Sequence, residues 1–285
     1  MAAIGKGAAP EGLRRLARKS LRGVLRDLQR ARSGGESEIH DVRKGLKLVR
    51  SLLRMVKPPI GKTFGKERKA RMSLGAVRKV LRRTAASAKA PTDIAGLVEE
   101  AETQVRVVVN ELGRWDLPRR DISPFVTGMR LCYANARKVL KRGLAKEDVA
   151  QLHEARKSLI HFRHQLEMVT PLWPSVLKAW ADDLQDLREV LGDLGDLEEL
   201  DCVLGSPICA DLPEAFRKTI ADLLAARRAD LLEKVKPPSS RLFAEKPVVL
   251  EKRLEALWMA ALRDRRRKAG PQTRKPAAAR EDSSG

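Results

Sequence analysis

The stretch EIHDVRKGLKLVRSLLRMVKP, residues 38–58, is the most informative part of the chain because a similar stretch follows later. QLHEARKSLIHFRHQLEMVTP occupies residues 151–171. With an offset of 113 residues, the identical pairs include His40 and His153, Arg43 and Arg156, Lys44 and Lys157, Leu46 and Leu159, Arg50 and Arg163, Leu53 and Leu166, Met55 and Met168, and Pro58 and Pro171. A second pair of segments, LGAVRKVL from Leu74 and LQDLREVL from Leu184, aligns with an offset of 110. These matches without gaps indicate an internal duplication.

Both stretches have the apolar spacing of an amphipathic helix. In the first copy the apolar stripe recurs every three or four residues and predicts the buried face of a helix; it consists of Ile39, Val42, Leu46, Val49, Leu53 and Val56. The paired prolines at positions 58 and 59 predict the end of that helix. The same periodicity predicts further helices near residues 11–32, 65–89, 91–113, 124–143, 147–169, 174–202, 213–235 and 247–268.

These elements predict an all-α fold made of two similar helical bundles, with an additional C-terminal helix. We expect a first bundle at residues 11–117 and a second at 118–269. Residues 1–10 are mostly small and are expected to be a flexible N-terminus. Residues 270–285 are polar without an apolar pattern and are expected to be disordered.

The charge is distributed very unevenly along the chain. The whole sequence of 285 residues has a net charge of +21. Residues 1–90 contain 25 basic and 6 acidic residues, whereas residues 91–285 contain 33 basic and 31 acidic residues. So large a local excess of positive charge predicts a polyanionic partner, such as nucleic acid, an anionic membrane or polyphosphate.

The basic residues of the first copy lie on one arc of the predicted helix, about 120° wide and separate from the apolar stripe. No acidic residue lies inside this arc. Like charges one turn apart repel each other by about 0.2–0.5 kcal/mol, so the missing acids suggest that a bound anion supplies the counter-charge. Arginine can hold a phosphate with two parallel hydrogen bonds, and lysine adds a point charge. The arc consists of His40, Arg43, Lys44, Lys47, Arg50 and Arg54.

The second copy repeats this face in a weaker form. Ile160 stands at the position equivalent to Lys47, and Glu167 stands at the position equivalent to Arg54. Because these two cations are missing from the second copy, we expect the first copy to bind more tightly. The candidate binding residues of the second copy are His153, Arg156, Lys157, Arg163 and His164. Candidates on other predicted helices are Arg22, Arg78, Arg82 and Arg137.

The sequence does not show the residue patterns that metal-binding proteins and enzymes require. All four histidines lie in the two repeated stretches, but no nearby cysteine or carboxylate spacing completes a metal site, so neither a metal nor a cofactor is expected. Histidine can hold phosphate or serve a structural role, and phosphate contact would make binding tighten as the pH falls through about 6.5. No nucleophile signature is present, and no Mg²⁺-binding carboxylates accompany the basic face, so no enzymatic activity is expected. With no apolar run of membrane-spanning length, a cytoplasmic location is the expectation.

The repeated motif H-x-x-R-K-x-L-x-x-x-R, at 40–50 and 153–163, resembles the conserved-histidine α-helical domain, or CHAD, family. LREVLGDLGDLEEL from Leu187 and the position of Tyr133 are also similar to that family, and the resemblance covers about residues 11–267. It implies two four-helix bundles related by a pseudo-twofold axis, binding of inorganic polyphosphate by the basic residues of the paired helices, and association with polyphosphate granules. The E-x-E-x-K motif of a fused triphosphate-tunnel enzyme domain is absent.

Three hypotheses follow from the sequence. The first is a non-enzymatic protein that holds polyphosphate in a basic groove between the two bundles. The alternative is a general nucleic-acid-binding basic protein, although aromatic residues for base stacking are scarce at 4% and no known DNA-binding motif is present. The third is an enzyme of phosphate transfer or hydrolysis. Protein partners, oligomeric state and preferred polyphosphate length are left open.

Overall fold

The computed structural model describes residues 9–31, 41–42, 44–45, 47–55, 94–112 and 122–269. All regular structure within these ranges is helical. The described α-helices are α1 (Ala9–Ala31), α4 (Ile94–Leu112), α5 (Ser123–Lys146), α6 (Val149–Val169), α7 (Pro174–Leu204), α8 (Glu214–Leu242) and α9 (Pro247–Ala269). Residues 41–42, 44–45 and 47–55 are also helical and are called the first motif helix below. The all-α prediction is therefore confirmed for the described residues.

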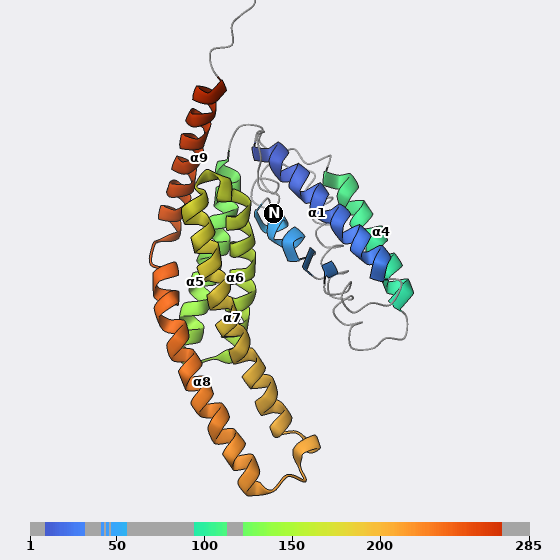
Figure 1. The fold of residues 1–285 in the computed structure, drawn as a ribbon, viewed down its shortest axis with the longest axis vertical. Coiled ribbons are helices and arrows are strands. Elements are labelled where there is room, and N and C mark those ends of the chain that lie inside the picture. Colours follow the sequence, from blue (N-terminus) through green and yellow to red (C-terminus); the bar gives the residue numbers. More distant parts are fainter. Residues whose placement is uncertain are drawn as a thin grey trace, which may run out of the picture.

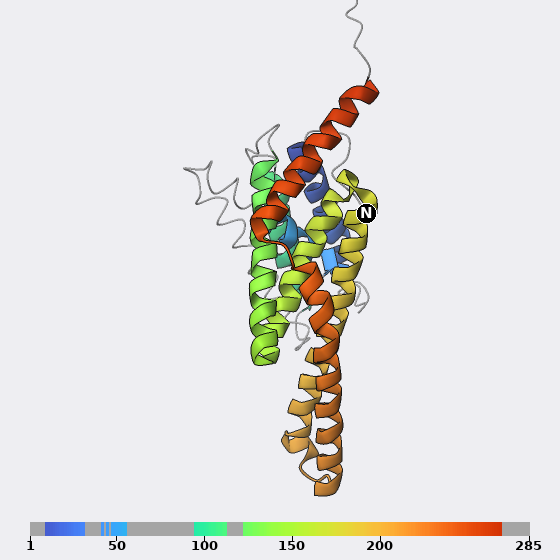
Figure 2. The ribbon, with the colours of Figure 1, turned by 90° about the vertical axis from the view of Figure 1, so that its left-hand side faces the viewer.

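Helices α5, α6 and α7 form the centre of the C-terminal part, and each packs against the next along the chain (Figure 1). Helix α8 continues along α7, and α9 packs back onto α5. The end of α7 and the start of α8 extend beyond the other helices as a two-helix projection, which both views show (Figures 1 and 2). In the N-terminal part, α1 packs against α4.

The turn between α5 and α6 is short and well defined. Glu147 ends α5 in the left-handed conformation, with φ of 50°, and its N–H donates to the Gly143 carbonyl. Asp148 then caps α6 by accepting a hydrogen bond from the backbone N–H of Gln151 at 3.1 Å. A Cβ at Gly143 would lie 2.8 Å from the Leu152 side chain, so glycine allows the two helices to approach closely there.

Aromatic residues fix the packing of α5, α6, α7 and the end of α8. The Tyr133 ring on α5 packs edge-on against Phe162 of α6 at 5.2 Å and against Trp180 of α7 at 6.3 Å between centroids. The Tyr133 hydroxyl donates to the Glu245 carbonyl at 3.0 Å, which satisfies the polar end of a fully buried ring.

The sequence prediction for α8 ended too early. The helix was expected to stop near residue 235, before Pro237 and Pro238, yet it continues to Leu242. Ser239 donates to the Val235 carbonyl, and Ser239 and Leu242 are both buried. Burial against the bundle thus holds the chain helical where the local propensity of proline disfavours it.

Several sequence predictions concern residues outside the described ranges. These are the flexible residues 1–8, the helix over 65–89 and the disordered tail over 270–285. The boundary between the two expected bundles, at residue 117, also lies outside them. None of the described helices combines the length and the apolar character needed to cross a membrane.

Candidate functional site

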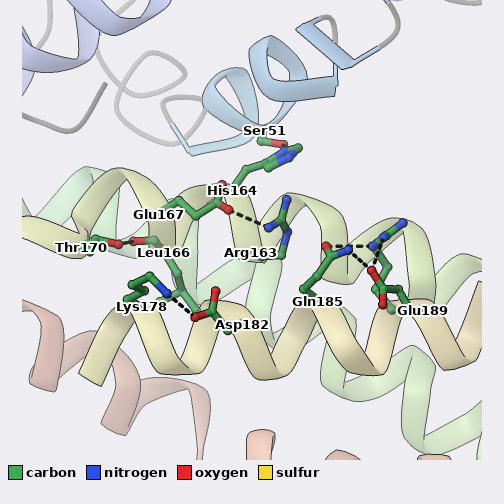
Figure 3. A network of polar contacts seen from close by, with 11 residues as sticks. Ser51, Arg163, His164, Leu166, Glu167, Thr170, Lys178, Asp182, Gln185 and Glu189 are labelled. Atoms are coloured by element: carbon green, nitrogen blue, oxygen red, sulfur yellow. Dashed lines mark hydrogen bonds and ion pairs between the residues drawn. The ribbon is translucent and has the colours of Figure 1, made fainter. Parts of the chain in front are cut away.

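The first motif helix lies against α6, and Ser51 is at the centre of their contact. Its hydroxyl oxygen is 2.9 Å from His161 Nδ1 and 3.1 Å from His164 Nδ1, and it donates to the Lys47 carbonyl at 2.9 Å. Gln165 Nε2 donates to the Ser51 carbonyl at 3.0 Å. Figure 3 shows His164 pointing from α6 toward Ser51. One buried polar cluster therefore joins two helices that are more than 100 residues apart in sequence.

The hydrogen-bonding capacity of the Ser51 hydroxyl restricts which nitrogen of each histidine carries the proton. A hydroxyl has one hydrogen to donate and two lone pairs that accept. When its hydrogen goes to the Lys47 carbonyl, His161 and His164 must both donate from Nδ1. That arrangement satisfies the Ser51 hydroxyl and places any further proton of either imidazole on Nε2.

Both histidines are neutral at physiological pH. Their side chains are buried, with 6% and 8% of the residue surface exposed. Burial, assisted by Arg54, Arg50 and the neighbouring His164, lowers the pKa of His161 to about 3. Burial also lowers the pKa of His164 to about 4, helped by the charges of Arg163, Lys47, Arg188 and Lys44. The charges around His164 thus come from three helices: the first motif helix, α6 and α7.

The cations of the first motif helix face outward from this cluster. Lys44, Lys47 and Arg54 are exposed, and Arg50 is partly exposed.

The first motif helix and α6 run in opposite directions. Arg54 lies near enough to Glu154 of α6 to contribute to lowering the pKa of that carboxyl, whereas Lys44 and Lys47 lie near His164. Residue numbers therefore rise along one helix as they fall along the other, so the two helices run antiparallel.

Arg156 of α6 is a partly buried cation that forms no ion pair with any described residue. Its Nε atom is buried and has no hydrogen-bond partner. A Cβ added at Gly192 of α7 would lie 3.3 Å from that Nε, so the arginine side chain runs across α7 at the glycine. Among the described residues no ion pair is formed by Arg156, Lys44 or Arg54. A guanidinium in this position is stabilised when an anion approaches it.

Arg163 is held differently. Its NH1 pairs with Glu167 at 2.7 Å, and its Nε is buried without a hydrogen-bond partner (Figure 3). Burial raises the pKa of the Glu167 carboxyl above its usual value, and the nearby Asp182 adds to this effect. Glu167, which stands in the second copy where the first copy has Arg54, thus pairs with an arginine of its own helix.

The remaining sequence candidates are more scattered. Lys157 is exposed and pairs with Glu154 at 2.7 Å, and His153 is exposed, with a pKa lowered by partial burial and by Lys157 and Arg156. Arg137 of α5 donates to the Phe243 carbonyl at 2.9 Å, and Arg22 is exposed on α1. No described contact joins either of these last two residues to Ser51 or its neighbours. His40, Arg43, Arg78 and Arg82 lie outside the described residues.

One cation beside the site was not among the sequence candidates. Arg188 of α7 has its pKa lowered by burial and by the charges of Arg156 and, to a smaller extent, Arg163. The signal was available, because the offset of 110 residues pairs Arg188 with Arg78, which was a candidate.

Within the described ranges, no group of three or more His, Cys, Asp or Glu side chains is arranged to hold a metal ion. The described side chains of the site offer fixed cations, carried by guanidinium and ammonium groups.

Comparison with protein families gives one match: residues 70–205 match the model of the CHAD domain. The match contains the second copy of the motif, at 151–171, and begins after the first copy, at 38–58. It confirms the family resemblance over a shorter range than the motifs had suggested. No curated protein and no solved structure was found to match the chain.

Proposed function

We propose that this protein binds inorganic polyphosphate without transforming it, because residues 70–205 match the model of the CHAD domain, a family generally associated with polyphosphate binding. The binding surface consists of the cations on the first motif helix, α6 and α7. The observation that carries the proposal is the convergence of Lys44, Lys47, Arg163 and Arg188 around the neutral His164.

The arrangement of charge favours a phosphate polymer as the ligand. Cations spaced about one helical turn apart, or about 5.4 Å, can each face a different phosphate of a closely spaced chain. Arg156 and Arg163 each have a buried Nε without a hydrogen-bond partner, so a bound phosphate would supply an acceptor that the protein does not.

Two similar halves related by a pseudo-twofold axis remain part of the proposal. Ser51 and His164 are counterparts under the 113-residue offset, and their side chains contact each other. Counterparts meet when two related helices cross close to a twofold axis, and the antiparallel direction of the two helices agrees with such an axis. The groove for the polymer would then run across this crossing, with the protein placed in the cytoplasm at polyphosphate granules.

The experiment is a competition titration with the full-length protein. Labelled long-chain polyphosphate is bound at 150 mM salt and challenged with duplex DNA and with tripolyphosphate at equal phosphate concentration. Retention of the labelled polymer against both competitors is the expected result. Displacement by DNA at equal phosphate would contradict the proposal and support the general nucleic-acid-binding protein, which the +21 charge also favours. Release of phosphate in the presence of Mg²⁺ would support an enzyme instead.

A matched pair of double variants locates the surface. Lys44→Gln with Arg54→Gln removes two exposed cations from the first motif helix, and Lys218→Gln with Lys252→Gln removes two exposed cations from α8 and α9. We expect the first pair to weaken binding at least tenfold and the second to change it less than twofold. With about six phosphates engaged, affinity should also fall by about a thousandfold between 50 and 200 mM salt. Equal losses in the two double variants would contradict this location.

A further inference from the structure

The second copy of the motif lacks the cations of the first at two positions, Ile160 and Glu167, and the structure shows what lies level with Ile160. Ile160 of α6 is the counterpart of Lys47. Arg156 contacts α7 at Gly192, and Glu167 lies near Asp182 of α7. Since α6 and α7 run antiparallel with equal rise per residue, these two contacts place position 160 level with position 188. Arg188 therefore lies opposite the position at which α6 has lost its cation.

The Arg188 side chain is held in place on α7. Its Nε donates to Gln185 Oε1 at 3.0 Å, and its NH2 lies 3.3 Å from Glu189 Oε1. Figure 3 shows Gln185 and Glu189 on α7 beside Arg163 of α6. Only 24% of the Arg188 side chain is exposed, and 21% of the Arg163 side chain. The guanidinium is thus recessed between the two helices rather than extended into solvent.

Three arginines converge at this seam. Arg156 lies across Gly192, which is one turn after Arg188 on the same face of α7. Arg163 lies on the other side, toward Gln185. Burial lowers the pKa of Arg188, and the charges of Arg156 and, to a smaller extent, Arg163 add to this effect, while Glu189 opposes it. Glu167 pairs with Arg163 and Glu189 with Arg188, whereas Arg156 forms no ion pair with the described residues. The three arginines therefore leave a net positive charge in a partly dehydrated seam, which is stabilised when an anion with several acceptor oxygens enters.

We propose that Arg188 is a ligand-binding residue that supplies from α7 the cation missing at Ile160. Arg156, Arg188 and Arg163 then form a recessed seat for one phosphate group of the polymer, an inference that rests on the proposed function. Each internal phosphate of the polymer has two non-bridging oxygens, and each oxygen can accept more than one hydrogen bond, so one phosphate can accept from all three guanidinium groups. A flexible phosphate chain can enter the seam, while the phosphates of duplex DNA lie on a wide, stiff surface. The seat therefore favours polyphosphate over duplex nucleic acid.

The test compares Arg188→Gln with Arg217→Gln in the full-length protein. Arg217 is a suitable control because it also pairs with a glutamate of its own helix, Glu214, but it lies on α8. Long-chain polyphosphate, tripolyphosphate and duplex DNA are titrated at 150 mM salt. We expect Arg188→Gln to weaken binding of both phosphate polymers about tenfold and that of DNA less than twofold, with Arg217→Gln like the wild type.

A rescue variant separates the ligand role from a structural one. Ile160→Lys in the Arg188→Gln background returns a cation to the same level of the seam, so it should recover most of the lost affinity, and Arg188→Lys should retain intermediate affinity. If the wild type binds polyphosphate and the Arg188→Gln variant binds it with the same affinity, this inference alone is overturned. A lost affinity that neither lysine variant recovers would also overturn it. Absence of polyphosphate binding by the wild type would overturn the proposed function together with it.

Discussion

Ser51 Oγ and His164 Nδ1 lie 3.1 Å apart, although 113 residues separate them, and the same offset aligns the two copies of the motif. Their contact joins the first motif helix to α6 at the point where the cations of both helices lie closest to a buried, neutral imidazole. The polar cluster therefore sets the relative position of the two helices, and with it the spacing of the charges that they carry.

The first prediction concerns this cluster. Ser51→Ala removes the hydroxyl that both histidines contact and leaves their Nδ1 atoms without that partner. We expect a loss of about 1–3 kcal/mol in the free energy of unfolding, measured by urea denaturation at pH 7.5. Ser240→Ala is the control, because Ser240 is exposed on α8 and contacts only a carbonyl of its own helix; it should change stability by less than about 0.5 kcal/mol. Equal effects would mean that the cluster does not stabilise the helix contact.

The second prediction is the direction of the pH dependence. The folded-state pKa values of His161 and His164, about 3 and about 4, lie below the unfolded value near 6.5. The unfolded chain therefore binds protons first as the pH falls, and the stabilising contribution is present above pH 6.5 and is lost progressively below it. Each histidine should lower the free energy of unfolding at pH 5 by on the order of 2 kcal/mol relative to its value at pH 7.

The measurement is the free energy of unfolding at pH 7 and at pH 5, in the wild type and in the double variant His161→Gln with His164→Gln. The variant should show a distinctly smaller loss over this range. Identical pH dependence in the two proteins would mean that these imidazoles are not the groups responsible. Keeping the pH at 5 or above limits the contribution of carboxylates, which titrate mainly at lower pH.

The third prediction concerns the approach of the first motif helix to α5. A Cβ at Gly128 would lie 2.2 Å from the Met55 carbonyl oxygen, which is backbone and has no rotamer to change. Gly128→Ala should therefore destabilise the protein by about 1–3 kcal/mol by forcing the helices apart. Gly195→Ala on α7 is the matched control, because a Cβ there meets nothing within 4 Å. It should stabilise the protein by about 0.5–1 kcal/mol through helix propensity, and thermal denaturation of both variants would show opposite shifts.

The fourth prediction concerns the acid of the second copy. Glu167→Gln removes the negative charge that pairs with Arg163 at 2.7 Å, so the arginine becomes available to a phosphate. Polyphosphate affinity should rise about twofold to fivefold, as expected for a partly exposed ion pair worth up to about 1 kcal/mol. Glu233→Gln on α8, which breaks the pair with Lys236, serves as the control and should leave affinity unchanged. A weaker affinity in Glu167→Gln would show that the pair positions Arg163 for binding.

Local patterns in the sequence account for most of the helices. The expected helix over 147–169 is observed as α6, Val149–Val169, and that over 174–202 as α7, Pro174–Leu204. Apolar spacing and prolines at helix starts are encoded within a few residues, so they can be read without the fold. The extension of α8 through Pro237 and Pro238 could not be read in this way, because burial against other helices overrides the propensity of proline.

The candidate site, like the helices, could be predicted from the sequence only in part. The all-helical character, the two copies of the motif and the strip of cations can all be read from the amino-acid sequence, because each depends on residues close together in the chain. Only the tertiary structure placed Ser51 between His161 and His164, paired Arg163 with Glu167 and brought Arg188 level with Ile160. These relations depend on which helices pack together and in what register, and that is decided by the burial of side chains from distant parts of the chain.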